Sequence, residues 1–69
     1  MPRSIHPTKE KLISTMVTLM DEHALSNIQV DDVLRESNIS KGSLYHHFEN
    51  FEELVEAALI ARFAASVDI

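Results

Sequence analysis

Apolar side chains recur at helical spacing in the first third of the chain. This pattern predicts a helix that begins after Pro7, takes Thr8 as its N-cap and ends near His23. Residues 25–27, which follow it, have turn character because serine and asparagine favour turns. The helix would direct six apolar residues towards the interior: Leu12, Ile13, Met16, Val17, Leu19 and Met20.

Two shorter helices are predicted at about residues 30–37 and 41–48, and the tight turn 38–40 joins them. Two helices connected by so short a turn are typical of a helix-turn-helix. Ser40 is well suited to cap the second helix of the pair. Apolar residues from both helices would hold the pair in the core: Val33, Leu34, Leu44 and Phe48.

A fourth helix is predicted after Asn50, which would act as its N-cap, with Glu53 at the capping-box position. No glycine or proline ends this helix, and apolar residues continue to Ile69, so we expect the natural protein to extend further. The chain is therefore predicted to be all-α. One face of the last helix should carry Phe51, Leu54, Val55, Ala58, Leu59 and Phe63.

The formal net charge of −5 argues against a nucleic-acid partner, but the distribution of charge changes this picture. Basic residues gather in residues 1–11 and 37–48, two segments that a fold could bring to one face. Apart from Glu10, acidic residues lie elsewhere and would repel phosphate from the other faces, which can orient the domain on DNA. The basic groups are Arg3, Lys9 and Lys11 in the first segment, and Lys41, His46 and His47 in the second.

Several classes of protein are disfavoured by what the sequence lacks. The chain has no cysteine, which excludes a disulfide scaffold and cysteine-based zinc sites. No apolar run follows Arg3 as in a signal peptide, and none reaches the roughly 18 residues of a membrane span. We therefore expect a cytoplasmic protein without membrane contact. With 69 residues, the chain is long enough for one domain.

The second helix of a helix-turn-helix enters the major groove of DNA with its N-terminal end first. Here that helix offers Lys41 for phosphates or base edges, and hydroxyls such as those of Ser43 and Tyr45 for phosphate oxygens. His46 and His47 diverge by about 100° on the helix, so they cannot chelate one metal ion together. No orienting acid accompanies a nucleophile, so we expect no enzyme, metal or cofactor.

The segment from Val30 to Phe48 resembles the helix-turn-helix of the TetR family, and its most distinctive stretch is Ser40-Lys41-Gly42-Ser43-Leu44-Tyr45-His46-His47-Phe48. The resemblance implies a three-helix, homeodomain-like DNA-binding domain at residues 6–50, with the helix-turn-helix motif at 29–48. Residues 51–69 would then form a fourth helix leading to a larger domain outside this chain. That domain would form the homodimer and bind a small-molecule inducer, so that two copies repress transcription from a palindromic operator in double-stranded DNA.

The resemblance also implies roles for single residues. Lys41, Gly42 and Ser43 should meet bases and phosphates, Tyr45 should hydrogen-bond a phosphate, and His46 should face the DNA. His47 should touch a phosphate or brace the turn before the last helix, while the start of the preceding helix should approach the DNA backbone. The complete predicted set of DNA-binding residues is Gln29, Val30, Ser40, Lys41, Gly42, Ser43, Tyr45, His46 and His47.

The chain departs from the family pattern at three positions. Asn38 replaces a glycine, a mild change because asparagine tolerates positive φ. Ala24 also replaces a glycine and would be strained by about 1 kcal/mol if its φ were positive. Phe51 replaces a phosphate-binding lysine, which should lower the salt dependence of binding by about one unit of slope. Together with the acidic net charge, this loss leaves open an alternative, a protein-interaction module that no longer binds DNA.

Overall fold

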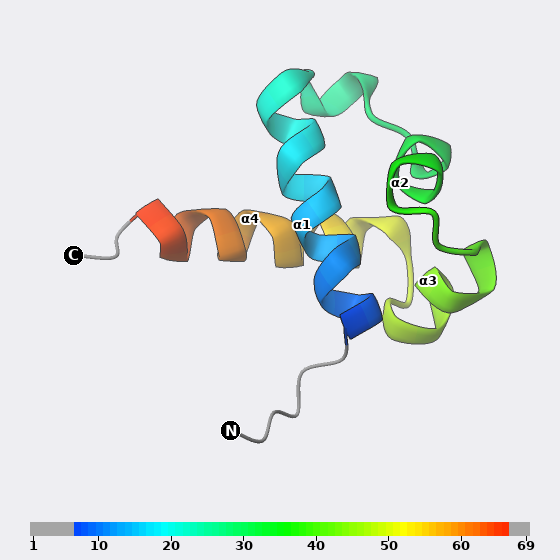
Figure 1. The fold of residues 1–69 in the computed structure, drawn as a ribbon. Coiled ribbons are helices and arrows are strands. Elements are labelled where there is room, and N and C mark those ends of the chain that lie inside the picture. Colours follow the sequence, from blue (N-terminus) through cyan, green and yellow to red (C-terminus); the bar gives the residue numbers. More distant parts are fainter. Residues whose placement is uncertain (1–6, 67–69) are drawn as a thin grey trace.

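The computed structural model describes residues 7–66, in which the other helices pack around α1 (Figure 1). The elements are α1 (Pro7–Glu22), the 3-10 turn η1 (Leu25–Asn27), α2 (Val30–Ser37), α3 (Lys41–His47) and α4 (Phe51–Ser66). The described residues contain no strand, and the prediction of an all-α fold is confirmed. Arg3 and Ile69, which the sequence argument used, lie outside the described residues.

The core forms where α1 packs against α2, α3 and α4. Three predicted positions of α1 are buried, and Val33 of α2 and Leu44 of α3 are fully buried beside them. Burial of each such side chain stabilises the fold by about 1.5–3 kcal/mol. Ile28, in the loop before α2, joins this core although no helical period predicts it. The buried apolar residues are Leu12, Met16, Leu19, Ile28, Val33, Leu44, Phe48, Leu54 and Ala58.

The first helix begins one residue earlier than the sequence predicted. Pro7 is its first residue, so Thr8 lies inside the first turn and the assignment of Thr8 as N-cap was wrong. Proline suits this position because its fixed φ matches a helix and the amide hydrogen that it lacks would have no partner within the helix. The predicted end near His23 is confirmed, since α1 ends at Glu22.

The connection from α1 to α2 is extended at Ala24 and then closes into a single 3-10 turn. Ala24 has φ −64° and ψ 142°, so this position carries none of the strain that a positive φ would impose. The N–H of Asn27 donates to the carbonyl of Ala24 at 2.8 Å, and the N–H of Ile28 donates to that of Leu25 at 3.1 Å. These bonds aim Ile28 at the core before α2 starts.

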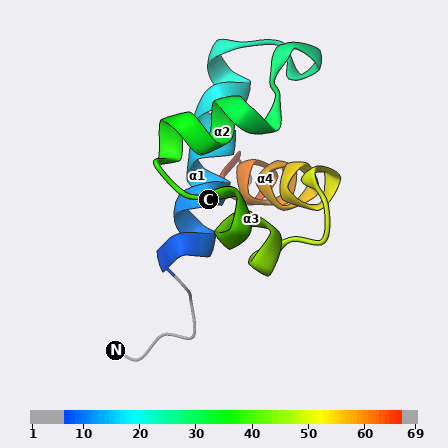
Figure 2. The ribbon, with the colours of Figure 1, turned by 90° about the vertical axis from the view of Figure 1, so that its right-hand side faces the viewer.

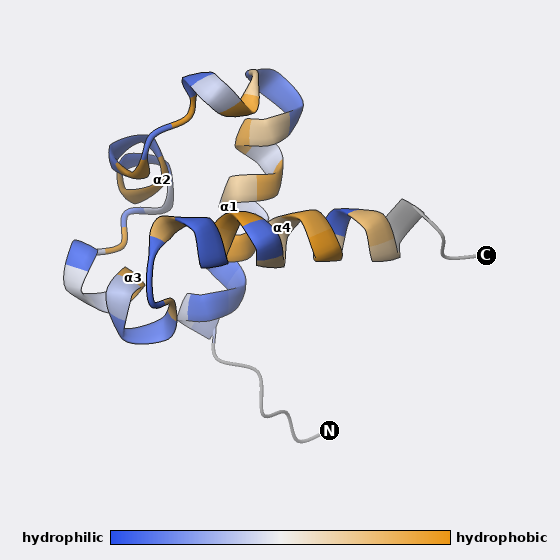
Figure 3. Cartoon of the chain, turned by 180° about the vertical axis from the view of Figure 1, so that it is seen from behind, coloured by the Kyte–Doolittle hydropathy of each residue, from blue (hydrophilic) through white to orange (hydrophobic). Residues whose placement is uncertain are grey.

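The fourth helix begins with the predicted cap at Asn50 and extends beyond the core. The N–H of Glu53 donates to Oδ1 of Asn50 at 2.9 Å, while the Glu53 carboxylate accepts the N–H of Glu49 at 2.9 Å. Figures 1 and 3 show α4 continuing past α1. Leu54 and Ala58 of the predicted apolar face are buried, whereas the second half of the helix extends beyond the core. Leu59, Ile60 and Phe63 are exposed by 46%, 68% and 70%.

Among residues 7–66, no helix is both long enough and apolar enough to cross a membrane.

Candidate nucleic-acid interface

The turn between α2 and α3 sets the angle at which α3 leaves the body of the protein. Asn38 has φ 60° and ψ 34°. Among the described residues, no other non-glycine residue has a positive φ. Its N–H donates to the carbonyl of Leu34 at 2.9 Å, and the N–H of Ile39 donates to the hydroxyl of buried Ser37 at 3.3 Å. Ile39 packs against the core. The left-handed conformation predicted for Asn38 is thus confirmed.

The first turn of α3 is closed by Ser40, as the sequence predicted. The Ser40 hydroxyl accepts the N–H of Ser43 at 3.2 Å and also donates to the Ser43 hydroxyl at 3.2 Å. Ser43 is half-buried, and the hydrogen bond from Ser40 engages its hydroxyl within the protein. A phosphate would have to compete with Ser40 for this hydroxyl.

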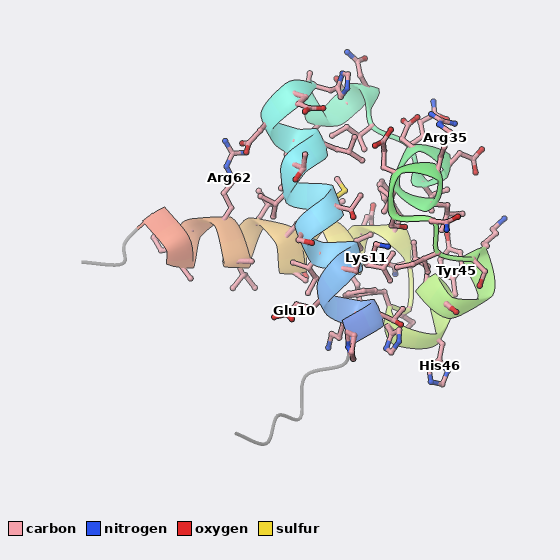
Figure 4. The ribbon with its side chains drawn as sticks, in the orientation of Figure 1. Glu10, Lys11, Arg35, Tyr45, His46 and Arg62 are labelled. Carbon is pink, nitrogen blue, oxygen red and sulfur yellow. The ribbon has the colours of Figure 1, made fainter. Side chains whose placement is uncertain are left out.

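α3 has an inner and an outer surface. Leu44 and Phe48 are buried on the inner surface, as predicted. Lys41 is exposed, Tyr45 is 39% exposed, and His46 extends away from the helix bundle in Figure 4. A seven-residue helix that is anchored by Leu44 and by the Phe48 that follows it cannot rotate about its axis without exposing one of these side chains. The outer surface is therefore held towards solvent.

Gly42 lies in the first turn of α3 and faces open space. A Cβ atom built at Gly42 would have no neighbouring atom within 4 Å. Packing inside the protein therefore does not explain the absence of a side chain at this position. The open space allows another molecule to approach the backbone of α3 closely.

The two histidines at the end of α3 contact each other edge to face, with ring centroids 5.1 Å apart and planes at 80°. His46 is exposed and His47 is half-buried. Within residues 7–66, no group of three or more histidine, aspartate or glutamate side chains is arranged to hold a metal ion. The pair thus presents one outward imidazole, that of His46, next to Tyr45.

The start of α2 is organised by Asp32. The Asp32 carboxylate accepts the backbone N–H of Gln29 at 2.9 Å and the guanidinium of Arg35 at 2.7 Å. The hydrogen bond from Gln29 is the main reason why the pKa of Asp32 is lowered from 3.8, and Arg35 adds to the effect. The side chain of Val30 is half-buried against the core, so of these two predicted DNA-binding residues only Gln29 is exposed.

The fold brings the first turn of α1 beside α3, as Figures 1 and 2 show. The ammonium of Lys9 lies 5.7 Å from the centroid of the Phe48 ring. The two basic segments recognised in the sequence are therefore adjacent where the structure describes them. Arg62 lies away from α3 in Figure 4, where it pairs with Asp21 at 3.0 Å. Lys9 was missing from the predicted site because only tertiary packing places it there.

The fold and the outward polar surface of α3 define a helix-turn-helix protein. The sequence model of the family described as "Bacterial regulatory proteins, tetR family" matches residues 12–58, more than half of the chain. The chain therefore belongs to the TetR family of bacterial regulatory proteins, as its resemblance implied.

Curated relatives agree with this assignment. The chain is 33% identical over 60 residues to the biofilm operon icaADBC HTH-type negative transcriptional regulator IcaR of Staphylococcus epidermidis, covering 87% of this chain and 32% of that protein. It is also 33% identical over 51 residues to IcaR of Staphylococcus aureus strain Newman, covering 74% of this chain and 27% of that protein. The chain thus spans about a third of the length of these relatives. It matches no solved structure.

Proposed function

We propose that this chain is the DNA-binding part of a transcriptional repressor and that α3 enters the major groove of double-stranded DNA. The observation that carries the proposal is the division of α3 into a buried apolar surface and an exposed polar one. Leu44 and Phe48 anchor the helix, while Lys41, Tyr45 and His46 remain exposed. A helix held in this way can enter a groove about 12 Å wide without losing its packing.

Each exposed residue has a proposed task. Lys41 pairs with a phosphate or a guanine edge, and bare Gly42 lets the backbone approach the DNA. The hydroxyl of Tyr45 donates to a phosphate, and His46 faces the bases. Supporting contacts would come from five further residues of the motif, with Ser43 near bases or phosphates: Gln29, Val30, Ser40, Ser43 and His47.

Repression is supported by the relatives, which are named as negative transcriptional regulators. We propose that residues 6–50 form the DNA-binding domain, with the motif at 29–48, and that residues 51–69 lead to a further domain. That domain would form a homodimer and bind a small-molecule inducer. Two α3 helices would then read a palindromic operator in successive major grooves about 34 Å apart. Such a repressor acts in the cytoplasm without a catalytic centre.

The test is a selection from duplexes with a randomised centre, followed by gel shifts at low and moderate salt. We expect one recurrent half-site to be enriched and its binding to weaken as salt is raised, because phosphate contacts release counterions. The chain should bind weakly, since the proposed dimer surface lies outside it. If no sequence is enriched and no duplex shows salt-sensitive binding, the interaction-module alternative replaces this proposal.

A further inference from the structure

The C-terminal end of α3 is an unfavourable place for a phosphate unless a cation is present. The last carbonyl groups of a helix carry partial negative charge, and three acids follow α3 in the next connection and the first turn of α4: Glu49, Glu52 and Glu53. Phe51, at the start of α4, is half-buried and contributes no charge. A duplex lying along α3 would meet this acidic edge with its sugar-phosphate backbone.

Lys9 provides a cation at this edge. Its ammonium lies 5.7 Å from the centroid of the ring of Phe48, the residue directly after α3, and Lys9 itself is exposed. The face of an aromatic ring attracts a cation, which holds the ammonium near the ring without removing its charge. By contrast, Arg35 and Arg62 form ion pairs with acids of α2 and α1.

The spacing of Lys9 and Lys41 along α3 also fits a duplex. Lys41 is the first residue of this seven-residue helix, and the Phe48 ring under Lys9 follows its last residue. A helix of this length rises by about 10 Å. The major groove is about 12 Å wide, so lysines at the two ends of a helix in that groove can reach phosphates on opposite strands.

We infer that Lys9 binds a DNA phosphate beside the C-terminal end of α3, opposite the phosphate bound by Lys41. This inference rests on the proposed DNA binding, and it adds a contact from α1 that the helix-turn-helix motif does not contain. The contact offsets the loss expected from Phe51. It also ties α1, the central helix of the fold, directly to the duplex.

The experiment measures binding of the 69-residue chain to a fluorescent mixed-sequence duplex of about 30 base pairs, at several salt concentrations between about 50 and 200 mM. The variants are Lys9→Gln, which removes the charge, and Lys9→Arg, which keeps it. Arg62→Gln is the matched control, because it removes one positive charge from the far side of the molecule. Far-UV circular dichroism checks that each variant remains helical.

We expect Lys9→Gln to lower the slope of log affinity against log salt by about 0.9, so that the advantage of the wild type shrinks about threefold to fourfold across this salt range. Lys9→Arg and Arg62→Gln should keep the wild-type slope. An unchanged slope for Lys9→Gln overturns the inference, and so does an equal loss in Arg62→Gln, which would reflect overall charge. If the wild type binds no duplex even at low salt, the proposed DNA binding itself is wrong, and the Lys9 contact is overturned with it.

Discussion

α3 and the second half of α4 expose opposite kinds of side chain to solvent. α3 buries Leu44 and Phe48 and exposes polar groups. The second half of α4 exposes Leu59, Ile60 and Phe63, and Figure 3 shows apolar segments along the projecting part of the helix. The first surface suits a charged, hydrated partner such as DNA, whereas the second is mainly apolar and its Arg62 is paired with Asp21.

The difference follows from where each helix meets α1. α3 has only seven residues, too few to be stable as an isolated helix, and it persists because its inner side chains are buried. α4 has sixteen residues, and its first half is held by Leu54 and Ala58. Its second half passes an open groove of about 660 Å³ that α1 lines with Ile13 and Val17. Burial is thus essential for α3, whereas the second half of α4 keeps an ion pair from Arg62 to α1 but leaves its large apolar side chains exposed.

The largest effect expected from this contrast is on stability. Leu44→Ala should lower the free energy of unfolding by about 2–5 kcal/mol, because it leaves a cavity at a fully buried site. A chain of this size has a total stability of about 3–10 kcal/mol, so much of this variant should be unfolded. Ile60→Ala, the matched aliphatic truncation on α4, should change stability by less than about 0.5 kcal/mol. Urea unfolding followed by circular dichroism measures both, and equal losses would contradict the comparison.

The next effect is on DNA affinity at fixed salt. Lys41→Ala should weaken binding to the selected duplex about tenfold, because it removes a charge-assisted contact. Tyr45→Phe should weaken it about fivefold, because only the hydroxyl is lost. Phe63→Ser, on the apolar surface of α4, should leave affinity unchanged and serves as the control. If both α3 variants bind like the wild type in the same titration, the proposed roles of Lys41 and Tyr45 are wrong.

Local chemistry made the motif predictable. The bounds 30–37 of α2, the left-handed conformation of Asn38 and the cap at Ser40 each depend on residues close in sequence. The buried positions Leu44 and Phe48 follow from helical spacing. The DNA-binding residues stay predictions, because exposure allows a contact but does not demonstrate one.

Features that depend on tertiary contacts could not be predicted. No periodicity places Ile28 in the core, because it lies outside every helix. The neighbourhood of Lys9 and Phe48, 39 positions apart in sequence, arises only when α1 packs against α3. The exposure of Leu59 depends on where α4 passes beyond α1, which an apolar stripe cannot indicate. The conformation of Ala24 was open for the same reason, since the path of the loop determines its φ.

The smallest effect expected is a pH dependence at the start of α2. The hydrogen bond from the N–H of Gln29, assisted by Arg35, holds the pKa of Asp32 below 3.8 in the folded protein. A carboxyl group with a lowered folded-state pKa stabilises the fold above its unfolded-state pKa, and this contribution is lost as the pH falls through the lowered value. Wild type should therefore be more stable than Asp32→Asn at pH 7, and the gap should close as the pH falls below 3.8.

Thermal unfolding of both proteins between neutral and strongly acidic pH measures this gap. The other carboxyl groups are the same in the two proteins, so their titration largely cancels from the difference. A gap that stays constant through the acidic range would mean that the Asp32 charge adds nothing to the start of α2. In that case the backbone hydrogen bonds of Asp32 and Val33 to the Gln29 carbonyl would set the start of the helix without help from the carboxylate.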